Sequence, residues 1–426
     1  MIAAFARRFA VACLVTLGLA GCGRSDDATV VRFWAMGREA EVVGELIADF
    51  ERTHPGVRID LQKLPWTAAH EKLLTAFAGD SLPDLCQLGN TWLPEFAALG
   101  ALEPLDAYVA KSGVVDASDY FPGIWDTNVV DERLLGVPWY VDTRLLFYRR
   151  DLLAAAGFDA PPRTWDEWRR MLAAIKRNAG ADKYAVLLPL DEFEPLLGLA
   201  IQQSDPLLAE HGTRGNFDST GFRRALAFYV EMFRETWAPP MSDTQIANVW
   251  FELGRGFYTF YISGPWNIVE FKKRLPPEAL AELRTAPLPG PDGAGVGVGG
   301  GTSLVLFAQS KRKAAAWQFV EYLSRREAQL RLHALTGDLP PRRSVWADPQ
   351  LAGDTLAHAF REQLESVRPA PKVPEWERIA NTMQLTAERV VRGGLPFDEG
   401  VAALDAQVDA ILEKRRWMLA RQAPKP

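Results

Sequence analysis

Residues 30–61 read VVRFWAMGREAEVVGELIADFERTHPGVRIDL, and this stretch decides the fold class. Residues 30–35 are mostly β-branched or aromatic, which predicts a strand. Apolar residues then recur at helical spacing over residues 39–52. A Pro-Gly pair stops this helix before a second, alternating strand at residues 57–61. A strand, a helix and a strand in this order predict parallel neighbours in an α/β sheet.

The same alternation of strands and helices continues along the chain. Thr164 precedes a helical pattern and Glu167 follows it three residues later, a spacing typical of a capping box. Residues 287–301 are rich in Gly and Pro, so we expect a connection or hinge there rather than a regular element. The other expected elements are helices at 68–78, after Trp92, at 223–235, at 313–323 and from 349 onward, and strands at 84–88, 134–141, 145–148 and 304–307.

The composition excludes several classes of protein. The chain has 426 residues, room for two or three domains, and is 48% hydrophobic and 24% charged, which argues against disorder and against a polytopic membrane protein. Its formal net charge is −6, whereas nucleic-acid surfaces need clustered Lys and Arg, so we expect no nucleic-acid partner. Three Cys and five scattered His, without HExxH or CxxC, predict neither a disulfide scaffold nor a metal site, and we expect no cofactor.

The first residues are typical of an export signal. Two Arg precede an apolar run over residues 9–19, which is too short to span a bilayer and leads into Leu19-Ala20-Gly21-Cys22. The small residues before Cys22 resemble a bacterial lipoprotein box, in which the Cys carries a diacylglycerol and begins the mature chain. An ordinary signal peptide that contains a Cys is the alternative. We therefore expect a signal peptide at 1–21, lipidation at Cys22, a tether at 22–29, and a location in the periplasm or cell envelope.

Short motifs follow one another over nearly the whole mature chain. They are found at residues 33–34 (FW), 50–57 (FERTHPGV), 78–85 (AGDSLPDL), 136–143 (GVPWYVDT), 147–153 (FYRRDLL), 162–168 (PRTWDEW), 262–266 (ISGPW), 310–311 (SK), 316–320 (AWQFV) and 336–340 (TGDLP). Any one of them is a weak signal. Together and in this order they resemble the extracellular solute-binding proteins of bacterial ABC sugar importers, of the maltose/trehalose-binding type.

The resemblance implies a two-lobed, periplasmic-binding-protein-like α/β fold, in which each lobe is a sheet flanked by helices and the ligand lies between the lobes. A ligand that touches both lobes favours the closed form, which the importer's membrane permease subunits then recognise. We expect a monomer that meets the membrane only through its lipid anchor. The expected boundaries are lobe 1 at 30–141 and 299–326, lobe 2 at 142–298 and 327–415, a tail at 416–426, and crossings near 140–143, 295–301 and 324–327.

A sugar-binding cleft needs polar partners for hydroxyl groups and aromatic platforms for the faces of the sugar ring. The resemblance implies that Asp142, at the end of a strand, accepts hydrogen bonds from the ligand; an ion pair with Arg144 is the alternative. Tyr140 lies two residues earlier, on the same strand face. The resemblance also implies that Trp266, after a Gly-Pro break, is a stacking platform; a place in the core is the alternative.

Other candidates follow breaks in the chain. Glu39 and Arg38 lie at the start of the first helix, where a ligand can use the helix N-terminus, although Glu there is favourable by the helix dipole alone. Asn90 follows a strand and either binds a ligand or caps the next helix. The bare backbone at Gly300 and Gly301 lets a sugar or the other lobe approach, but Thr302 stands where the family often has an aromatic nearby. The remaining candidates are Trp92, Glu192, Arg343 and Trp376.

Three classes of function remain open. We expect a sugar binder without enzymatic activity, with a disaccharide such as trehalose or maltose as ligand. A monosaccharide, a longer glucan or glycerol 3-phosphate would use the same fold. A glycoside hydrolase also combines carboxylates with aromatic platforms, and a lipoprotein adhesin or assembly factor would need no cleft.

Overall fold

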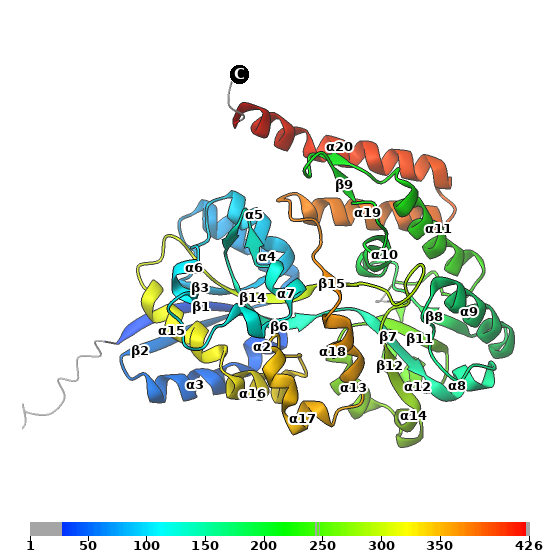
Figure 1. Ribbon diagram of the computed structural model, residues 1–426, viewed down its shortest axis with the longest axis horizontal. Helices are drawn as coiled ribbons and strands as arrows, with labels where there is room; N and C mark the ends of the chain where they lie inside the picture. Colours follow the sequence, from blue (N-terminus) through cyan, green and yellow to red (C-terminus); the bar gives the residue numbers. More distant parts are fainter. Residues whose placement is uncertain (1–27, 243–244, 247, 423–426) are drawn as a thin grey trace, which may run out of the picture.

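The protein folds as two α/β lobes joined by crossing segments (Figure 1). The structure, a computed structural model, describes residues 28–242, 245–246 and 248–422. The expected signal peptide, the lipidation site Cys22 and most of the tether therefore lie outside the described residues. Within the described ranges, helices that combine the length and the apolar composition needed to cross a bilayer are absent.

The first lobe is built on a five-stranded mixed sheet with the order β2-β1-β3-β14-β6. β1 pairs in parallel with β2 and β3, as the opening stretch predicts, whereas β14 runs antiparallel to both β3 and β6. β14 therefore returns from a distant part of the chain to complete the sheet. The strands are β1 (Thr29–Met36), β2 (Val57–Leu64), β3 (Leu85–Gly89), β6 (Val137–Asp142) and β14 (Gly300–Leu306).

Helices cover both faces of this sheet. In β1, Phe33 packs into one buried cluster and Trp34 into another, on the opposite side of the sheet. The helix expected over residues 39–52 is divided at Val43, which is fully buried. The helices around this sheet are α2 (Gly37–Val42), α3 (Gly44–Thr53), α4 (Trp66–Ala78), α5 (Leu93–Ala98), α15 (Lys313–Leu323) and α16 (Arg326–Thr336).

The placement of α16 differs from the expected lobe boundary, which assigned residues from 327 onward to the second lobe. Ala328 and Leu332 of α16 belong to the same buried cluster as Phe33, and the helix contacts α2 and α3. Its apolar side is therefore buried in the first lobe. The reason is that the chain leaves this lobe only after α16 has completed the core.

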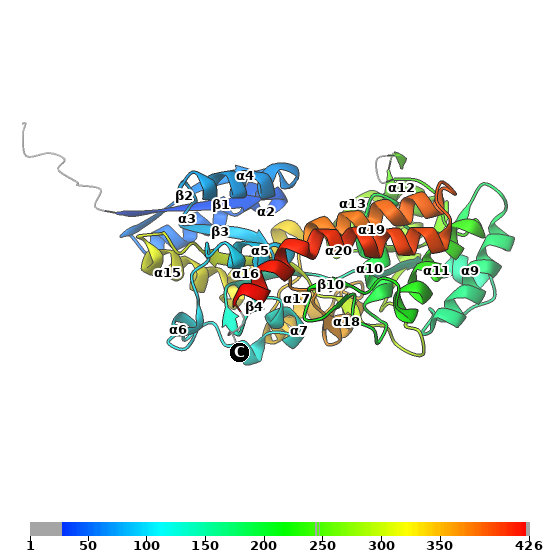
Figure 2. The ribbon, with the colours of Figure 1, turned by 90° about the horizontal axis from the view of Figure 1, so that it is seen from above.

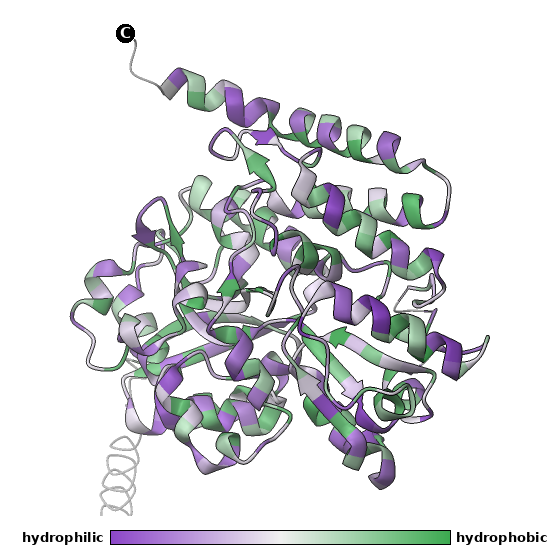
Figure 3. Ribbon diagram, turned by 45° about the vertical axis from the view of Figure 1, so that its right-hand side comes forward, coloured by the Kyte–Doolittle hydropathy of each residue, from purple (hydrophilic) through white to green (hydrophobic). Residues whose placement is uncertain are grey.

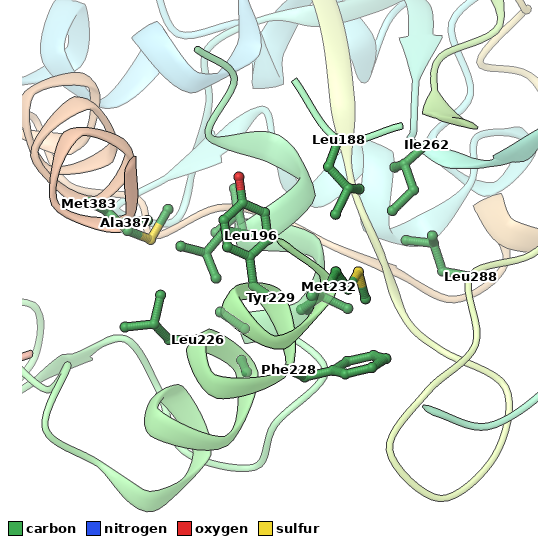
Figure 4. Packing of buried hydrophobic residues seen from close by; sticks show 14 of the residues in the cluster. Leu188, Leu196, Leu226, Phe228, Tyr229, Met232, Ile262, Leu288, Met383 and Ala387 are labelled. Atoms are coloured by element: carbon green, nitrogen blue, oxygen red, sulfur yellow. The ribbon is translucent and has the colours of Figure 1, made fainter. Parts of the chain in front are cut away.

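The second lobe is built on a four-stranded sheet with the order β12-β7-β11-β8. β11 pairs in parallel with β8 and antiparallel with β7, which pairs antiparallel with β12. Figure 4 shows part of its core, where Tyr229 and Met232 pack near Leu196, Met383 and Ala387. The strands are β7 (Leu145–Arg149), β8 (Tyr184–Leu187), β11 (Tyr258–Ser263) and β12 (Leu283–Ala286).

The helices of the second lobe include one whose start the sequence predicts in detail. Thr164 Oγ1 accepts a hydrogen bond from the Glu167 amide at 3.1 Å, and Glu167 Oε2 accepts one from the Thr164 amide at 3.2 Å, which confirms the capping box. α19 and α20 run side by side along the lobe (Figure 2). The longest helices here are α9 (Trp165–Ala179), α11 (Thr220–Arg234), α13 (Trp266–Arg274), α19 (Trp376–Val391) and α20 (Phe397–Gln422).

The hydrophobic residues in Figure 3 follow the sheets and the inner sides of the helices. Shorter elements complete the fold. They are α6 (Asp106–Val109), α7 (Pro122–Asp126), β4 (Val129–Val130), β5 (Arg133–Leu134), α8 (Arg150–Ala155), α10 (Glu194–Ala200), β9 (Leu208–Ala209), β10 (Arg214–Gly215), α12 (Val249–Gly254), α14 (Pro277–Glu282), β13 (Gly297–Val298), α17 (Pro349–Ala352), α18 (His358–Leu364) and β15 (Val367–Arg368).

Three expectations about local structure are wrong. The Gly-rich run at 287–301 contains β13 and the start of β14, because β13 finds a parallel partner in β15. The same β15 and a Pro-rich segment after it interrupt the helical pattern expected from 349 onward, since Pro cannot donate a helical hydrogen bond. Residues 416–422 continue α20 rather than forming a tail, and Arg416 donates to the carbonyls of Thr213 and Asp409.

Candidate functional site: a cleft between the lobes

A cavity of about 570 Å³ lies between the two lobes. Residues of the first lobe, of the second lobe and of the segments that cross between them all line it. Its lining is Glu39, Trp66, Gly89, Asn90, Thr91, Trp92, Tyr140, Asp142, Thr143, Arg144, Phe193, Glu194, Leu197, Trp266, Val298, Gly300, Gly301, Thr302, Asp338 and Glu377. The cavity is therefore rich in aromatic rings and carboxyl groups.

The backbone that precedes Trp266 fixes the position of its side chain in the cleft. It begins α13 directly after Gly264-Pro265, and a Cβ atom at Gly264 would lie 1.9 Å from the indole Cζ3. The ring thus packs against the bare backbone of Gly264, and only glycine leaves room for it. The guanidinium of Arg144 lies 4.8 Å from the centre of the same ring, in a cation–π contact.

A second aromatic group lies on the first lobe. Trp66 and Trp92 meet edge to face, with ring centres 5.7 Å apart, and His70 lies 4.9 Å from Trp92. His70 Nε2 lies 2.6 Å from Glu95 Oε2, and this hydrogen bond raises the pKa of His70. Both tryptophans line the cavity, so the first lobe presents two indole rings to it and the second lobe presents Trp266.

Three carboxyl groups come together near the crossing strand β6. Burial raises the pKa of Asp142 to about 6, and its Oδ1 has no hydrogen-bond donor among the described residues. Burial also raises the pKa of Asp338 well above its usual value, and the negative charge of Glu39 raises it further. Glu39 Oε2 accepts a hydrogen bond from Gln87 Nε2 at 3.2 Å. The site therefore holds carboxyl groups that are short of donors, which a ligand with hydroxyl groups could supply.

Among the described residues that line the cleft, Arg144 is the one Arg or Lys residue. Its Nη1 lies 3.1 Å from Glu192 Oε2 and its Nη2 lies 3.0 Å from Glu194 Oε1. These two carboxylates, rather than Asp142, hold the guanidinium. The charge of Arg144 is thus already balanced by the second lobe.

Glycines let two strands of the site approach each other closely. Gly301 has a φ of 125°, and a Cβ atom there would lie 2.3 Å from the Tyr140 carbonyl oxygen. A Cβ atom at Gly300 would lie 2.6 Å from the Asp142 carbonyl oxygen. The bare backbone therefore makes room for β6, the strand that carries Tyr140 and Asp142 into the cleft.

Most of the residues predicted from the sequence line the cavity, and four do not. Arg38 is exposed and pairs with Glu41, because the next residue, Glu39, takes the inward position on α2. Glu192 lies behind Arg144 rather than in the lining. The predicted residues that do line it are Glu39, Asn90, Trp92, Tyr140, Asp142, Trp266, Gly300 and Gly301.

The other two misplaced residues lie in the second half of the chain. Trp376 has an exposed fraction of 1% and is packed in the core of the second lobe, while its neighbour Glu377 lines the cleft. Arg343 forms an ion pair with Glu365 away from the cavity. In both regions the sequence shows a break before the residue but not the direction of its side chain.

Several lining residues were missed. Glu377 accepts a hydrogen bond from Thr91 Oγ1 at 2.6 Å, which joins the two lobes across the cleft. Trp66 follows Pro65 at the start of α4, the same kind of break that singled out Trp266. Asp338 follows Gly337, which has a φ of 87°. For Trp66 and Asp338, the preceding proline or glycine was the sequence feature that could have identified them.

Two α/β lobes with an aromatic and acidic cavity between them define a two-lobed solute-binding protein. Residues 37–330 match the family of bacterial extracellular solute-binding proteins, and the chain belongs to this family. Within the described ranges, clusters of three or more His, Cys, Asp or Glu residues placed to hold a metal ion are absent.

Relatives in other bacteria support this assignment. The solved structure of the sugar-binding protein MalE from the phytopathogen Xanthomonas citri is 60% identical, with a TM-score of 0.89, and the match covers 92% of this chain and 99% of that one. A putative binding protein of Brucella abortus (strain 2308) is 26% identical over 96% of this chain and 99% of its own length. The diacetylchitobiose binding protein DasA of Streptomyces coelicolor is 24% identical over 90% of this chain and 92% of its own length.

Proposed function

We propose that the protein is the substrate-binding component of an ABC importer, which captures a sugar outside the inner membrane and delivers it to the permease by hinge closure. The proposed ligand is a disaccharide such as trehalose or maltose. The observation that carries the proposal is one cavity lined by Trp266 and Tyr140 together with Asp142 and Glu39. Indole and phenol rings suit the faces of sugar rings, and carboxylates suit their hydroxyl groups.

The cavity can supply the affinity that such a function requires. Its volume of about 570 Å³ is in the range of small-molecule sites. Hydrogen bonds to charged groups contribute about 1.5–3 kcal/mol each, and a micromolar dissociation constant corresponds to about −8 kcal/mol. A few hydroxyl–carboxylate contacts and a stacked indole are therefore sufficient.

The charges of the cleft favour a neutral sugar over an anionic solute such as glycerol 3-phosphate. Among the described lining residues the carboxyl groups of five side chains face one guanidinium, Arg144, which Glu192 and Glu194 already balance. A phosphate would meet net repulsion there. The relatives named for sugar or diacetylchitobiose binding support a carbohydrate as well.

The cellular setting of the proposal comes from the sequence. The leader and the resemblance support export, a lipid anchor at Cys22, a monomeric state and permease subunits as partners. We keep the lobe boundaries near residues 141 and 299 as part of the proposal, since the crossing segments there lead directly into the cleft.

A calorimetric screen of the purified protein against common sugars tests the proposal. We expect trehalose or maltose to bind, to raise the melting temperature, and to be recovered intact. Recovery of glucose would indicate that the protein is a glycoside hydrolase. The absence of binding to every small solute tested would favour a lipoprotein adhesin.

The same titration on variants tests the cleft. We expect Trp266→Ala to weaken binding by about tenfold or more, since a stacked ring and its buried area are lost, while circular dichroism shows an intact fold. Trp376→Phe is the matched control, because Trp376 is a core residue outside the cleft. It should lower stability and leave the affinity unchanged. A reversed pattern would place the binding site elsewhere.

A further inference from the structure

A second cavity, of about 550 Å³, lies outside the sugar cleft. It shares no lining residue with the cleft, among the described residues. β15 and the segment after it form one wall, with Arg368 at the end of the strand and Lys372 in the segment, and α20 contributes Arg415. Asp131, in the turn between β4 and β5, comes from the first lobe, so the cavity lies where the two lobes meet.

The cavity contains hydrogen-bond donors that the described protein leaves without acceptors. Gln203 has an exposed fraction of only 8%, and its Nε2 is buried with no partner among the described residues. Nε of Arg415 is likewise buried without a described partner. Burying a donor without an acceptor is unfavourable, and both side chains line the cavity, so a small rotation of each toward an acceptor in the cavity would satisfy two groups from separate parts of the chain.

The positive charges of the lining are less well balanced than those of the cleft. Arg415 forms no ion pair with the other described residues. Arg368 Nη1 donates a hydrogen bond to the neutral Ile201 carbonyl at 3.2 Å. Lys372 pairs with Asp126. Of the two acidic lining residues, Asp205 already accepts a hydrogen bond from the Gly221 amide at 2.8 Å, and Asp131 is exposed.

The chemistry of the cavity differs from that of a sugar site. Its described lining contains no Trp, Tyr or Phe, so a sugar ring would find no stacking platform. Guanidinium groups with an amide N–H form the set of donors that recognises planar or tetrahedral oxyanions. We propose that this cavity binds a small solute carrying a phosphate group, held by Gln203, Arg368 and Arg415.

Titration of the purified protein with inorganic phosphate tests the proposal. Ionic strength is kept constant with NaCl, and binding is followed by calorimetry and by the melting temperature. We expect saturable binding to the wild type, and a loss of affinity of about tenfold or more in Arg415→Gln, since one charge-assisted contact is removed. Gln203→Met keeps the volume, removes the donor and should also weaken binding.

Lys414→Gln is the matched control. It removes the same charge from the neighbouring position of α20, but Lys414 is exposed and lies outside the cavity. We expect this variant to bind phosphate as the wild type does. Equal losses in Lys414→Gln and Arg415→Gln would show attraction to surface charge and overturn the proposal, as would the absence of saturable binding.

A third variant separates this site from the sugar cleft. If Arg144→Gln abolished phosphate binding while Arg415→Gln retained it, the ion would lie in the cleft and the proposal would be wrong. All these measurements are made without sugar, so they do not depend on which sugar the cleft binds.

Discussion

Asp142 illustrates how a single residue gives the cleft its chemistry. Its Oδ1 is buried without a described donor, and burial raises its pKa to about 6 from a model-compound value of 3.8. A carboxylate in this state gains more from a ligand hydroxyl than an exposed one does, because its desolvation has already occurred. The unpaired carboxyl group therefore lowers the stability of the ligand-free protein, and it is available to accept a hydrogen bond from the ligand.

The pKa of Asp142 predicts that sugar affinity depends on pH. Above about pH 6 the carboxylate accepts hydrogen bonds from hydroxyl groups, and below it the group is protonated, so we expect affinity to fall between pH 7 and pH 5. Calorimetry across this range measures the effect. Asp142→Asn should bind more weakly at pH 7 and show a shallower dependence, with Asp338 and Glu377 as the remaining titrating groups nearby. Equal slopes in both proteins would contradict the assignment.

The same shift predicts the sign of a stability effect. The folded state holds the proton of Asp142 more tightly than the unfolded state, so this residue's contribution to stability decreases as pH rises from about 4 to about 6. Asp142→Asn removes this decrease, and its free energy of unfolding should depend less on pH over that window. Urea denaturation at several pH values provides the measurement.

At the scale of elements, the junction between β11 and α13 positions Trp266, the proposed aromatic platform. β11 ends at Ser263 and α13 begins at Trp266, so Gly264-Pro265 turns the chain within two residues. The indole packs on Gly264, where any Cβ atom would overlap the ring. The position of Trp266 is thus a property of the junction rather than of the tryptophan alone.

This junction predicts that Gly264→Ala displaces the ring. We expect the affinity for the sugar to fall by about tenfold or more although Trp266 itself is unchanged, because the platform no longer has its position. Gly44→Ala is the control, since a Cβ atom there meets nothing within 4 Å. Calorimetry compares the two variants. An unaltered affinity in Gly264→Ala would mean that the ring's position is unimportant for binding.

At the scale of the whole molecule, the two lobes meet through an apolar cluster, in which Phe121, directly before α7, and Ile124 of α7 join Leu145 and Phe147 of β7, and through polar contacts. Thr91 donates to Glu377 across the cleft, and Lys372, in the segment after β15, pairs with Asp126 of the first lobe. A partly exposed ion pair such as Lys372–Asp126 contributes little to stability, and the free energy gained from a ligand that touches both lobes favours the closed form. This arrangement is suited to a protein that must release its ligand again.

We therefore expect ligand binding to compact the molecule. Small-angle X-ray scattering should show a smaller radius of gyration with saturating sugar than without it. The melting temperature should rise in the same titration, with about 2.7 kcal/mol of stabilisation at 100 times the dissociation constant. Trp266→Ala at the same sugar concentration should show smaller changes. An unchanged radius in the wild type with bound sugar would exclude hinge closure.

Local patterns in the sequence determined much of this protein. The strand-helix-strand order at residues 30–61, the capping box at Thr164 and helix α15 depend on interactions between residues close in the chain, and they are as predicted. The family resemblance, together with the strand end at Asp142 and the Gly-Pro break before Trp266, pointed to Tyr140, Asp142 and Trp266 as cleft residues, and all three line the cavity.

Only the tertiary structure decided which neighbour faces the cleft and which segments meet. Glu39 rather than Arg38, and Glu377 rather than Trp376, line the cavity, because successive helix residues point about 100° apart and packing selects one of them. α16 joined the first lobe, and β13 found β15, through contacts between segments far apart in the chain. Such contacts depend on the burial of surfaces that form only when the whole chain has folded, and no local pattern carries that information.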